Sequence, residues 1–568
     1  MAENRADLST ALLPESGPSL SGPEAPAARQ GARRLPFLAL TLFLPGIIVI
    51  GNFVLGARTP ITLWPEDDMM FFDPVWRYVQ GHHLGTDFHS PLGFGPFQVA
   101  AMLWRLLGPH YYLLRASACL FALVIVLCSF VVATRQLRHA PGLAALFCIT
   151  VAFEASGPST YGWFHDFGMS LFYDRLLMSA SLVLFVQSFT NDLDSRRERD
   201  WVDHFIAAFL LNILFLVKVS GLVLGLAIVV AGRIVRGRFS RSLVDISLVL
   251  VFLAVMLTID FVVTGTSFSP VIHEYLLAAQ ARAGSYSVLD VLHSTTRLPV
   301  LGVVVLMALY AVSRPGGGSA SLWRCFFIIA FFWACQVAFN MSNDSPAILF
   351  LAPAAAVAVV TWTDTPETAV FWKHLWTRFD PRRLDEISAR EVIPLLLIAL
   401  VLAPEALSSL RALKLDCSIS SGTAKAITVT ANKGIAFKVL AREPSNSNFA
   451  LSINRAIQAI EGLGASRDTI ANLDYMNPFP ALLLSPAPKG ASVFWVFGIS
   501  VPIGYKPGWQ EVIGDACIVT EPKHRPFKLL IDAVQPHLTS AFTLVYQDEL
   551  WRIWKLSGGC DAMGGSSK

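Results

Sequence analysis

The chain has 568 residues, of which 54% are hydrophobic and only 15% are charged, and its formal net charge at pH 7 is +3. A soluble protein of this length needs a far larger charged surface, so the composition excludes an ordinary soluble enzyme and predicts a polytopic membrane protein. The small net charge, without a basic run of the phosphate-binding kind, indicates no nucleic-acid partner. No glycine-rich nucleotide loop, HExxH or CxxC motif is present, so nucleotide and structural zinc chemistry are not indicated.

Residues 1–34 are rich in Ala, Pro, Ser and Gly, which predicts a disordered tail. The apolar run from Leu35 to Val54 that follows is too long for the hydrophobic region of a signal peptide, so it predicts an uncleaved first span. Arg33 and Arg34 stand directly before this run. They place the tail in the cytoplasm, because Lys and Arg beside spans remain on the cytoplasmic side.

Further apolar segments follow as far as residue 407, and the basic loops between them are predicted to be cytoplasmic. The segment at 92–108 is short and contains glycine, proline and arginine, so we interpret it as juxtamembrane or re-entrant. This interpretation gives eleven spans, and thirteen spans are the alternative. The predicted apolar segments are 37–55, 92–108, 113–134, 142–155, 167–189, 203–219, 221–236, 243–264, 298–313, 323–341, 346–362 and 391–407.

The sequence thus predicts a transmembrane domain at 35–409, with a first outer loop at 57–91, and an extracytoplasmic domain at 410–568. In the last part, short strand patterns mix with amphipathic helix patterns, which indicates an α/β domain. The expected strands are 428–431, 493–497, 517–520 and 542–546, and the expected helices are 454–463 and 527–534. A disulfide is feasible outside the cell, and among Cys417, Cys517 and Cys560 the first choice is Cys417 with Cys517.

Three consecutive carboxylates, Glu66, Asp67 and Asp68, lie in the first predicted outer loop. Like charges this close raise one another's pKa unless a cation compensates, so the cluster suits a general base, a metal site, or both. In the metal interpretation the ligands are Glu66 and Asp68. A solvated acidic loop is the alternative, but neighbouring aromatic residues such as Trp64 and Trp76 favour a partly buried interfacial setting.

The residues that follow the cluster carry a resemblance to a known family. The matching motifs are Asp67 to Gly81, Thr86-Asp87, Ser90-Pro91-Leu92-Gly93, Leu107-Gly108 and Arg115. This pattern resembles the start of glycosyltransferase family 39-like proteins, the GT-C membrane transferases that include protein O-mannosyltransferases and lipid A aminoarabinose transferases. The resemblance covers residues 35–230. The chain departs from it in having Asp67-Asp68 where many relatives have Asp-Glu, and a single proline in the proline-led segment.

The resemblance implies a mainly α GT-C helix bundle of about 11–13 spans and a sugar donor linked to a polyprenyl phosphate. It implies that Asp67 takes the proton from the acceptor hydroxyl, while Asp68 or Glu66 orients it or holds a divalent metal ion. One direct displacement then inverts the anomeric centre. The sugar is a hexose or a pentose, and an envelope glycan, a glycolipid and a protein all stay open as acceptors.

Six further residues are predicted to bind substrate: Asp87, Asp166, Asp174, Arg175, Lys218 and Arg282. Asp87 either positions the acceptor or caps the following helix. Asp174 and Arg175 are either functional or a structural ion pair, because charges at membrane depth are costly. Lys218 and Arg282 are predicted to bind the donor phosphate, although Lys218 can instead reach the lipid headgroups.

Two other function classes stay open. A secondary transporter also carries charged residues within the bilayer, although the chain shows none of the internal repeats that transporters tend to have. A non-catalytic envelope-assembly protein, whose C-terminal domain binds a polysaccharide or a partner, is the other alternative. In each case we expect a multi-pass protein of the plasma membrane, placed in a bacterial inner membrane.

Overall fold

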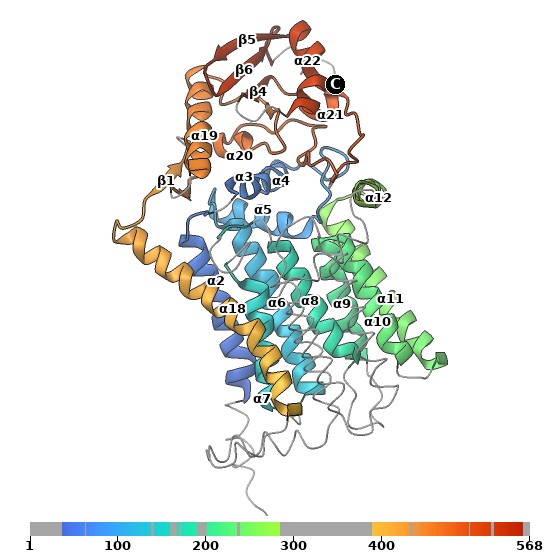
Figure 1. Ribbon diagram of the computed structural model, residues 1–568. Helices are drawn as coiled ribbons and strands as arrows, with labels where there is room; N and C mark the ends of the chain where they lie inside the picture. Colours follow the sequence, from blue (N-terminus) through green and yellow to red (C-terminus); the bar gives the residue numbers. More distant parts are fainter. Residues whose placement is uncertain are drawn as a thin grey trace, which may run out of the picture.

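The computed structural model of the chain describes residues 37–62, 64–137, 141–158, 167–169, 172–189, 201–235, 239–283, 389–431, 435–441, 444–498, 500–523 and 527–560. These residues form a bundle of helices that carries a mixed α/β domain at one end (Figure 1). The predicted tail at 1–34 and the predicted spans at 298–313, 323–341 and 346–362 lie outside the described residues.

Three helices of the described part are long and apolar enough to cross a membrane: Ala39–Arg58, Leu113–Gln136 and Leu243–Thr264. The first consists of a π-helical turn, η1 (Ala39–Phe43), and the helix α2 (Leu44–Arg58). Every predicted apolar segment in the described part forms a helix, which supports the polytopic membrane class. The other helices of the bundle are α6 (Leu113–Gln136), α7 (Pro141–Ser156), α8 (Phe172–Phe189), α9 (Trp201–Val217), α10 (Val219–Val235), α11 (Phe239–Thr264) and α18 (Ala389–Ser420).

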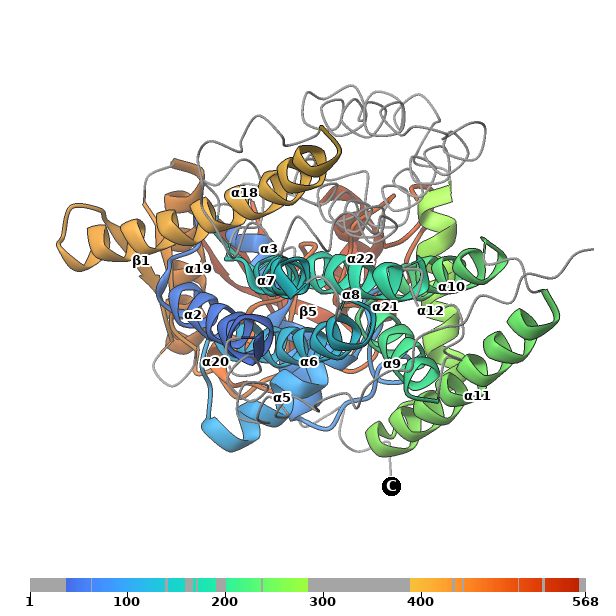
Figure 2. The ribbon, with the colours of Figure 1, turned by 90° about the horizontal axis from the view of Figure 1, so that it is seen from below.

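Helix α8 is the centre of the bundle. It packs against α6, α7, α9 and α10, which Figure 2 shows on both sides of it. Its residues from Phe172 to Ser188 are all buried, as expected of a helix that is apolar all round. The charged residues of its first turn, Asp174 and Arg175, therefore lie inside the protein rather than against lipid.

Helix α5 (Gly95–Leu107) corresponds to the segment at 92–108, predicted to be juxtamembrane or re-entrant. One face is buried through Phe97, Ala101 and Trp104, whereas Leu106 and Leu107 are exposed. Its 13 residues extend for about 20 Å, which is too short to cross a hydrocarbon core of about 30 Å. A juxtamembrane position fits this length, and α5 lies near the end of the bundle that carries the C-terminal domain (Figure 1).

The C-terminal domain contains a four-stranded sheet in the order β3-β4-β6-β5 and a separate two-stranded sheet. In the larger sheet only β3 and β4 are parallel. The strands are β1 (Ala426–Val429), β2 (Phe437–Leu440), β3 (Ile470–Asn472), β4 (Ile518–Pro522), β5 (Phe542–Gln547) and β6 (Trp551–Leu556). The helices are α19 (Pro444–Gly462), α20 (Phe479–Leu483), α21 (Trp509–Ile513) and α22 (Lys528–Ala541), so the α/β class is confirmed.

Two details of the sequence prediction need correction. No strand forms at 493–497, because Val493 N–H donates to the carbonyl of His89 rather than to a sheet neighbour. The disulfide joins Cys517 to Cys560, whose Cα atoms are 5.5 Å apart, while Cys417 is free and exposed. Helix α18 extends across position 409 and ends at Ser420, and the domain boundary predicted there stays a prediction.

The C-terminal domain is joined to the first outer loop by hydrogen bonds along much of that loop. Ile61 extends the edge of β2, since its N–H donates to Lys438 O at 2.9 Å. Further along, Trp76 Nε1 donates to Ser485 O at 2.6 Å, and the N–H of Gly490 donates to Asp87 O. The short helices α3 (Pro65–Met70) and α4 (Phe72–Val79) of the loop are therefore held between bundle and domain (Figure 1).

A buried ion pair lies at the centre of this joint. Arg77 and Asp73, one turn apart on α4, are both fully buried, and Arg77 Nε lies 3.0 Å from Asp73 Oδ1. Arg77 Nη1 also donates to the carbonyl of Pro488 in the C-terminal domain. Its guanidinium carbon lies 5.5 Å from the ring centre of Phe88. One cation thus connects α4, the outer loop and the domain.

We expect Arg77→Met to lower the free energy of unfolding by about 3–5 kcal/mol, because it leaves the Asp73 carboxylate buried without a counter-charge. Adding Asp73→Asn removes that charge and is expected to recover part of the loss. The apparent Tm of the purified protein in detergent measures both effects. Arg455→Met is the matched control, since Arg455 pairs with Glu549 at the surface and its loss is expected to change the Tm little. An equal loss in both single variants contradicts this account.

Candidate active site

The three carboxylates lie together on α3, the first helix of the outer loop. Trp64 precedes the helix in the left-handed backbone conformation (φ 47°, ψ 61°), which turns the chain into Pro65. Proline is favourable at the first helical position and acidic residues are favourable in the first turn, so the local sequence suits a short helix at this point. The environments of Asp67 and Asp68 nevertheless differ sharply.

Asp68 is fully buried, and both of its oxygens accept hydrogen bonds. Oδ2 accepts the Tyr111 hydroxyl at 2.7 Å, and Oδ1 accepts the backbone N–H of Met169 at 2.5 Å. Gly168 leaves the room for this contact, because a Cβ on it would lie 3.0 Å from Asp68 Oδ1. Asp68 therefore joins α3 to the segment before α8 and to the start of α6, and its oxygens are engaged by the protein itself.

Asp67 is partly exposed, and its environment does not favour the charged form. Burial, then the charge of Asp68, then that of Glu66 raise the pKa of Asp67 from 3.8 to about 7. The hydroxyl of Tyr475, from the C-terminal domain, lies 3.5 Å from Asp67 Oδ1 and opposes the rise. A carboxyl group with a pKa near neutrality is suited to accept a proton during a reaction.

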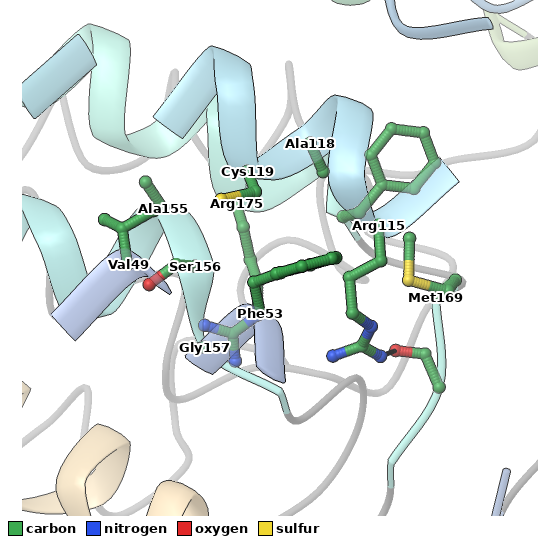
Figure 3. Close-up of a pocket in the computed structure, with 12 residues that line it drawn as sticks. Val49, Phe53, Arg115, Ala118, Cys119, Ala155, Ser156, Gly157, Met169 and Arg175 are labelled. Carbon is green, nitrogen blue, oxygen red and sulfur yellow. Dashed lines mark hydrogen bonds between the residues drawn. The ribbon is translucent and has the colours of Figure 1, made fainter. Parts of the chain in front are cut away.

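A hollow opens between α2, α6, α7 and α8, and the Gly168–Met169 segment, which also bonds to Asp68, is part of its lining. Two arginines, Arg115 and Arg175, extend into it, and Figure 3 shows them with Phe53 and other apolar neighbours. Asp67 does not line this hollow. The residues that line the hollow are Val49, Phe53, Arg115, Ala118, Cys119, Ala155, Ser156, Gly157, Gly168, Met169, Phe172 and Arg175.

Both arginines of the hollow use part of their donor capacity for the protein. Arg115 Nη2 donates to Gly168 O at 3.0 Å, while the buried Arg115 Nε has no hydrogen-bond partner among the described residues. Arg175 Nη1 donates to Glu154 O at 3.3 Å. Gly56 on α2 makes room for Arg115, since any side chain there would overlap its guanidinium group. Two cations beside apolar walls suit an anionic group attached to a hydrocarbon chain.

Asp174 and Lys218 form a second, separate ion pair at the same end of the bundle. Lys218 Nζ donates to Asp174 Oδ1 at 3.3 Å, and both side chains are buried. The same ammonium group lies 5.0 Å from the ring centre of Tyr173. Because Lys218 is 4% exposed, its side chain does not reach out to lipid headgroups. Asp174 therefore pairs with Lys218, whereas its sequence neighbour Arg175 points into the hollow.

Asp87 does not join this group. Asp87 Oδ2 accepts the backbone N–H of His83 at 2.8 Å, so Asp87 stabilises its own turn. Asp166 lies outside the described residues, as does the side chain of Arg282 on α12 (Phe268–Ala283). Within the described part of the chain, no three His, Cys, Asp or Glu side chains converge in a way that could hold a metal ion. The predicted ligands Glu66 and Asp68 thus have no third candidate ligand beside them in this part of the chain.

Three residues of the site had no assigned role in the sequence prediction. Tyr111 and Arg115 stand four residues apart at the start of α6, and polar side chains at the mouth of an apolar helix are a signal that was available. Tyr475 gives no such signal, because its contact with Asp67 joins positions 408 residues apart in the sequence. Only the docking of the C-terminal domain brings it to α3.

The solved structures that are similar to this chain include two of ArnT from Cupriavidus metallidurans. The apo form is 13% identical and has a TM-score of 0.44, with 93% of this chain and 98% of that one covered. The form bound to undecaprenyl phosphate is also 13% identical, with a TM-score of 0.43 and coverages of 92% and 98%. ArnT is a lipid A aminoarabinose transferase, one of the groups that the sequence resembles.

Other comparisons add little. The YdaH transporter of Alcanivorax borkumensis is 16% identical over 69% of this chain and 90% of that one, with a TM-score of 0.11. No protein-family model matches the chain, and no curated protein matches it in sequence. Likenesses of this degree establish neither activity nor substrate, so a functional assignment rests on the residues themselves.

We expect Asp67→Asn to stabilise the protein. The raised pKa means that the folded state holds the charged carboxylate less well than the unfolded chain does, so stability falls as pH rises from about 4 to about 7. A shift of this size corresponds to at most ~4 kcal/mol, and partial exposure reduces the expected gain to about 1–2 kcal/mol. The apparent Tm should therefore rise more at pH 8 than at pH 4.5.

Asp68→Asn is the matched comparison for this measurement. An amide offers only one acceptor oxygen, so either Tyr111 or Met169 loses its hydrogen-bond partner, and we expect a lower Tm. Equal stabilisation by both substitutions would show that the two carboxylates do not differ as described.

Proposed function

We propose that the protein is an inverting membrane glycosyltransferase that moves a sugar from a polyprenyl-phosphate donor to an acceptor outside the cytoplasm. The observation that carries the proposal is the difference in environment between two adjacent carboxylates. Asp68 is engaged by the protein, whereas Asp67 is partly exposed and has a pKa of about 7. The sequence resemblance supplies the donor class and the role of Asp67 as base.

The reaction follows from these positions in one displacement. Asp67 takes the proton of the acceptor hydroxyl while the oxygen of that hydroxyl forms a bond to the anomeric carbon. At the same time the bond from this carbon to the phosphate oxygen breaks, and the electron pair leaves with the phosphate. The anomeric carbon passes through an oxocarbenium-like state, which the nearby carboxylates stabilise, and its configuration is inverted.

In this proposal the phosphate of the donor binds in the hollow that contains Arg115 and Arg175. The positive charges of the two arginines, with the unsatisfied Nε of Arg115, can stabilise the charge that develops on the leaving phosphate, and the apolar walls can receive the first isoprene units. The Gly168–Met169 segment lines the hollow and also bonds to Asp68, the neighbour of the proposed base, so it connects the two parts of the proposed site. We retain Lys218, Arg282, Asp166, Asp174 and Asp87 as predicted substrate contacts.

Asp67→Asn is expected to lower transfer by at least about 100-fold, because the general base is lost while the side-chain shape is kept. In the unsubstituted protein, activity should rise with pH through about 7 and level off above it, since only the deprotonated carboxylate accepts a proton. Both effects are measured as the rate of sugar transfer by the purified protein. The donor is a radiolabelled polyprenyl-phosphate sugar, and an envelope extract supplies the acceptor. Asp468→Asn, a substitution at a surface carboxylate in the C-terminal domain, is the control.

Full activity of the Asp67 variant would remove it as the base. Uptake of the sugar into sealed vesicles without turnover of the lipid would instead support the transporter alternative.

Arg175→Gln is expected to raise the KM for the donor about tenfold or more, because a charge-assisted hydrogen bond to phosphate contributes about 1.5–3 kcal/mol. The effect on kcat should be smaller if Arg175 acts mainly in binding. Arg135→Gln is the matched control, since Arg135 lies at the opposite end of α6 from Arg115 and pairs with Asp203. An unchanged KM in the Arg175 variant argues against a phosphate in this hollow.

A further inference from the structure

The C-terminal domain places one polar side chain directly beside the proposed base. Tyr475 belongs to the loop between β3 and α20, and its hydroxyl lies 3.5 Å from Asp67 Oδ1. Helix α20 packs on α4 in the first outer loop, and α19 packs on α3, so this loop faces the acidic cluster (Figure 1). Catalytic hydrogen bonds are often this long without substrate and tighten in the complex.

The loop that carries Tyr475 is held in one conformation from both ends. Asn472 Nδ2 donates to Met476 O at 2.9 Å, and Asn477 Nδ2 donates to Ile470 O at 2.8 Å. The hydroxyl of Thr520 on β4 donates to Asn472 Oδ1 and so fixes that side chain in turn. The tyrosine ring is therefore positioned by the edge of the sheet, and its direction is set before any ligand binds.

The other partner, Asp67, is fixed against the same domain. Gln80 Oε1 accepts the N–H of Ala487 at 2.8 Å, and Trp76 Nε1 donates to the carbonyl of Ser485. These bonds hold α4, which directly follows α3, to the C-terminal domain. The distance between Tyr475 and Asp67 is thus set by well-bonded segments on both sides.

We propose that Tyr475 is a positioning residue. Its hydroxyl donates to Asp67 Oδ1 and orients the carboxylate so that Oδ2 is presented to the acceptor hydroxyl, which makes the C-terminal domain a component of the active site. This inference rests on the proposed function of Asp67 as base. It gives each member of the acidic pair its own tyrosine, since Tyr111, two residues before α6, donates to Asp68. The bundle fixes one carboxylate and the C-terminal domain directs the other.

The test removes and then restores the donor atom at position 475 in the full-length protein. Tyr475→Phe is expected to lower kcat about tenfold, with the donor KM and the apparent Tm unchanged, because the ring still fills its place. Incorporation of 4-aminophenylalanine restores an N–H donor and should recover most of the lost kcat. Tyr546→Phe is the matched control, since its hydroxyl also donates to a carboxylate, Asp548, at 2.9 Å, but on β5.

The inference is overturned if Tyr475→Phe keeps full kcat, or if the loss is not recovered by the amino analogue. It is also overturned if kcat falls only in proportion to the Tm, which indicates a purely structural role. The proposed base is tested separately by Asp67→Asn. An inactive Asp67 variant beside a fully active Tyr475 variant removes only the positioning role, whereas an active Asp67 variant removes the proposed function.

Discussion

The rest of the site depends on the two hydrogen bonds that Asp68 accepts, because they join three segments that are distant in the sequence. Tyr111 brings the start of α6 to α3, and the N–H of Met169 brings the segment before α8. That segment also lines the hollow that contains the two arginines. A buried carboxylate is costly unless its lone pairs are satisfied, and in this position its satisfaction assembles the site.

The same arrangement explains why two neighbouring aspartates have different chemistry. Both oxygens of Asp68 accept hydrogen bonds from the protein. The negative charge of Asp68 lies next to Asp67, where it opposes the loss of the proton from Asp67. Asp67 lacks comparable partners and remains partly exposed, so its pKa is raised toward the pH at which it has to accept a proton. Environment, rather than residue type, separates the anchoring carboxylate from the reactive one, in the way that paired acids in other enzymes are driven apart.

Sequence patterns predicted the helical segments of the described part, the juxtamembrane α5 and the acidic cluster, because apolar length and charge are local properties. They failed where long-range packing decides. The segment at 493–497 has strand-like residues but bonds to the outer loop. Tyr475 is the clearest case, because nothing in its neighbourhood indicates a partner 408 residues away.

The joint between bundle and domain also constrains how the site can work. Arg77 and Asp73 are buried between α4 and the C-terminal domain, and separating the two parts would expose the pair and break the bonds to Ser485, Ala487 and Pro488. Opening of the whole domain is therefore an expensive way to admit a substrate. For the lipid-linked donor that we propose, the less costly route keeps its chain in the bilayer while only its phosphate enters beside Arg115 and Arg175. On this proposal the C-terminal domain stays fixed and orients the base, and the substrate enters from the membrane side of the bundle.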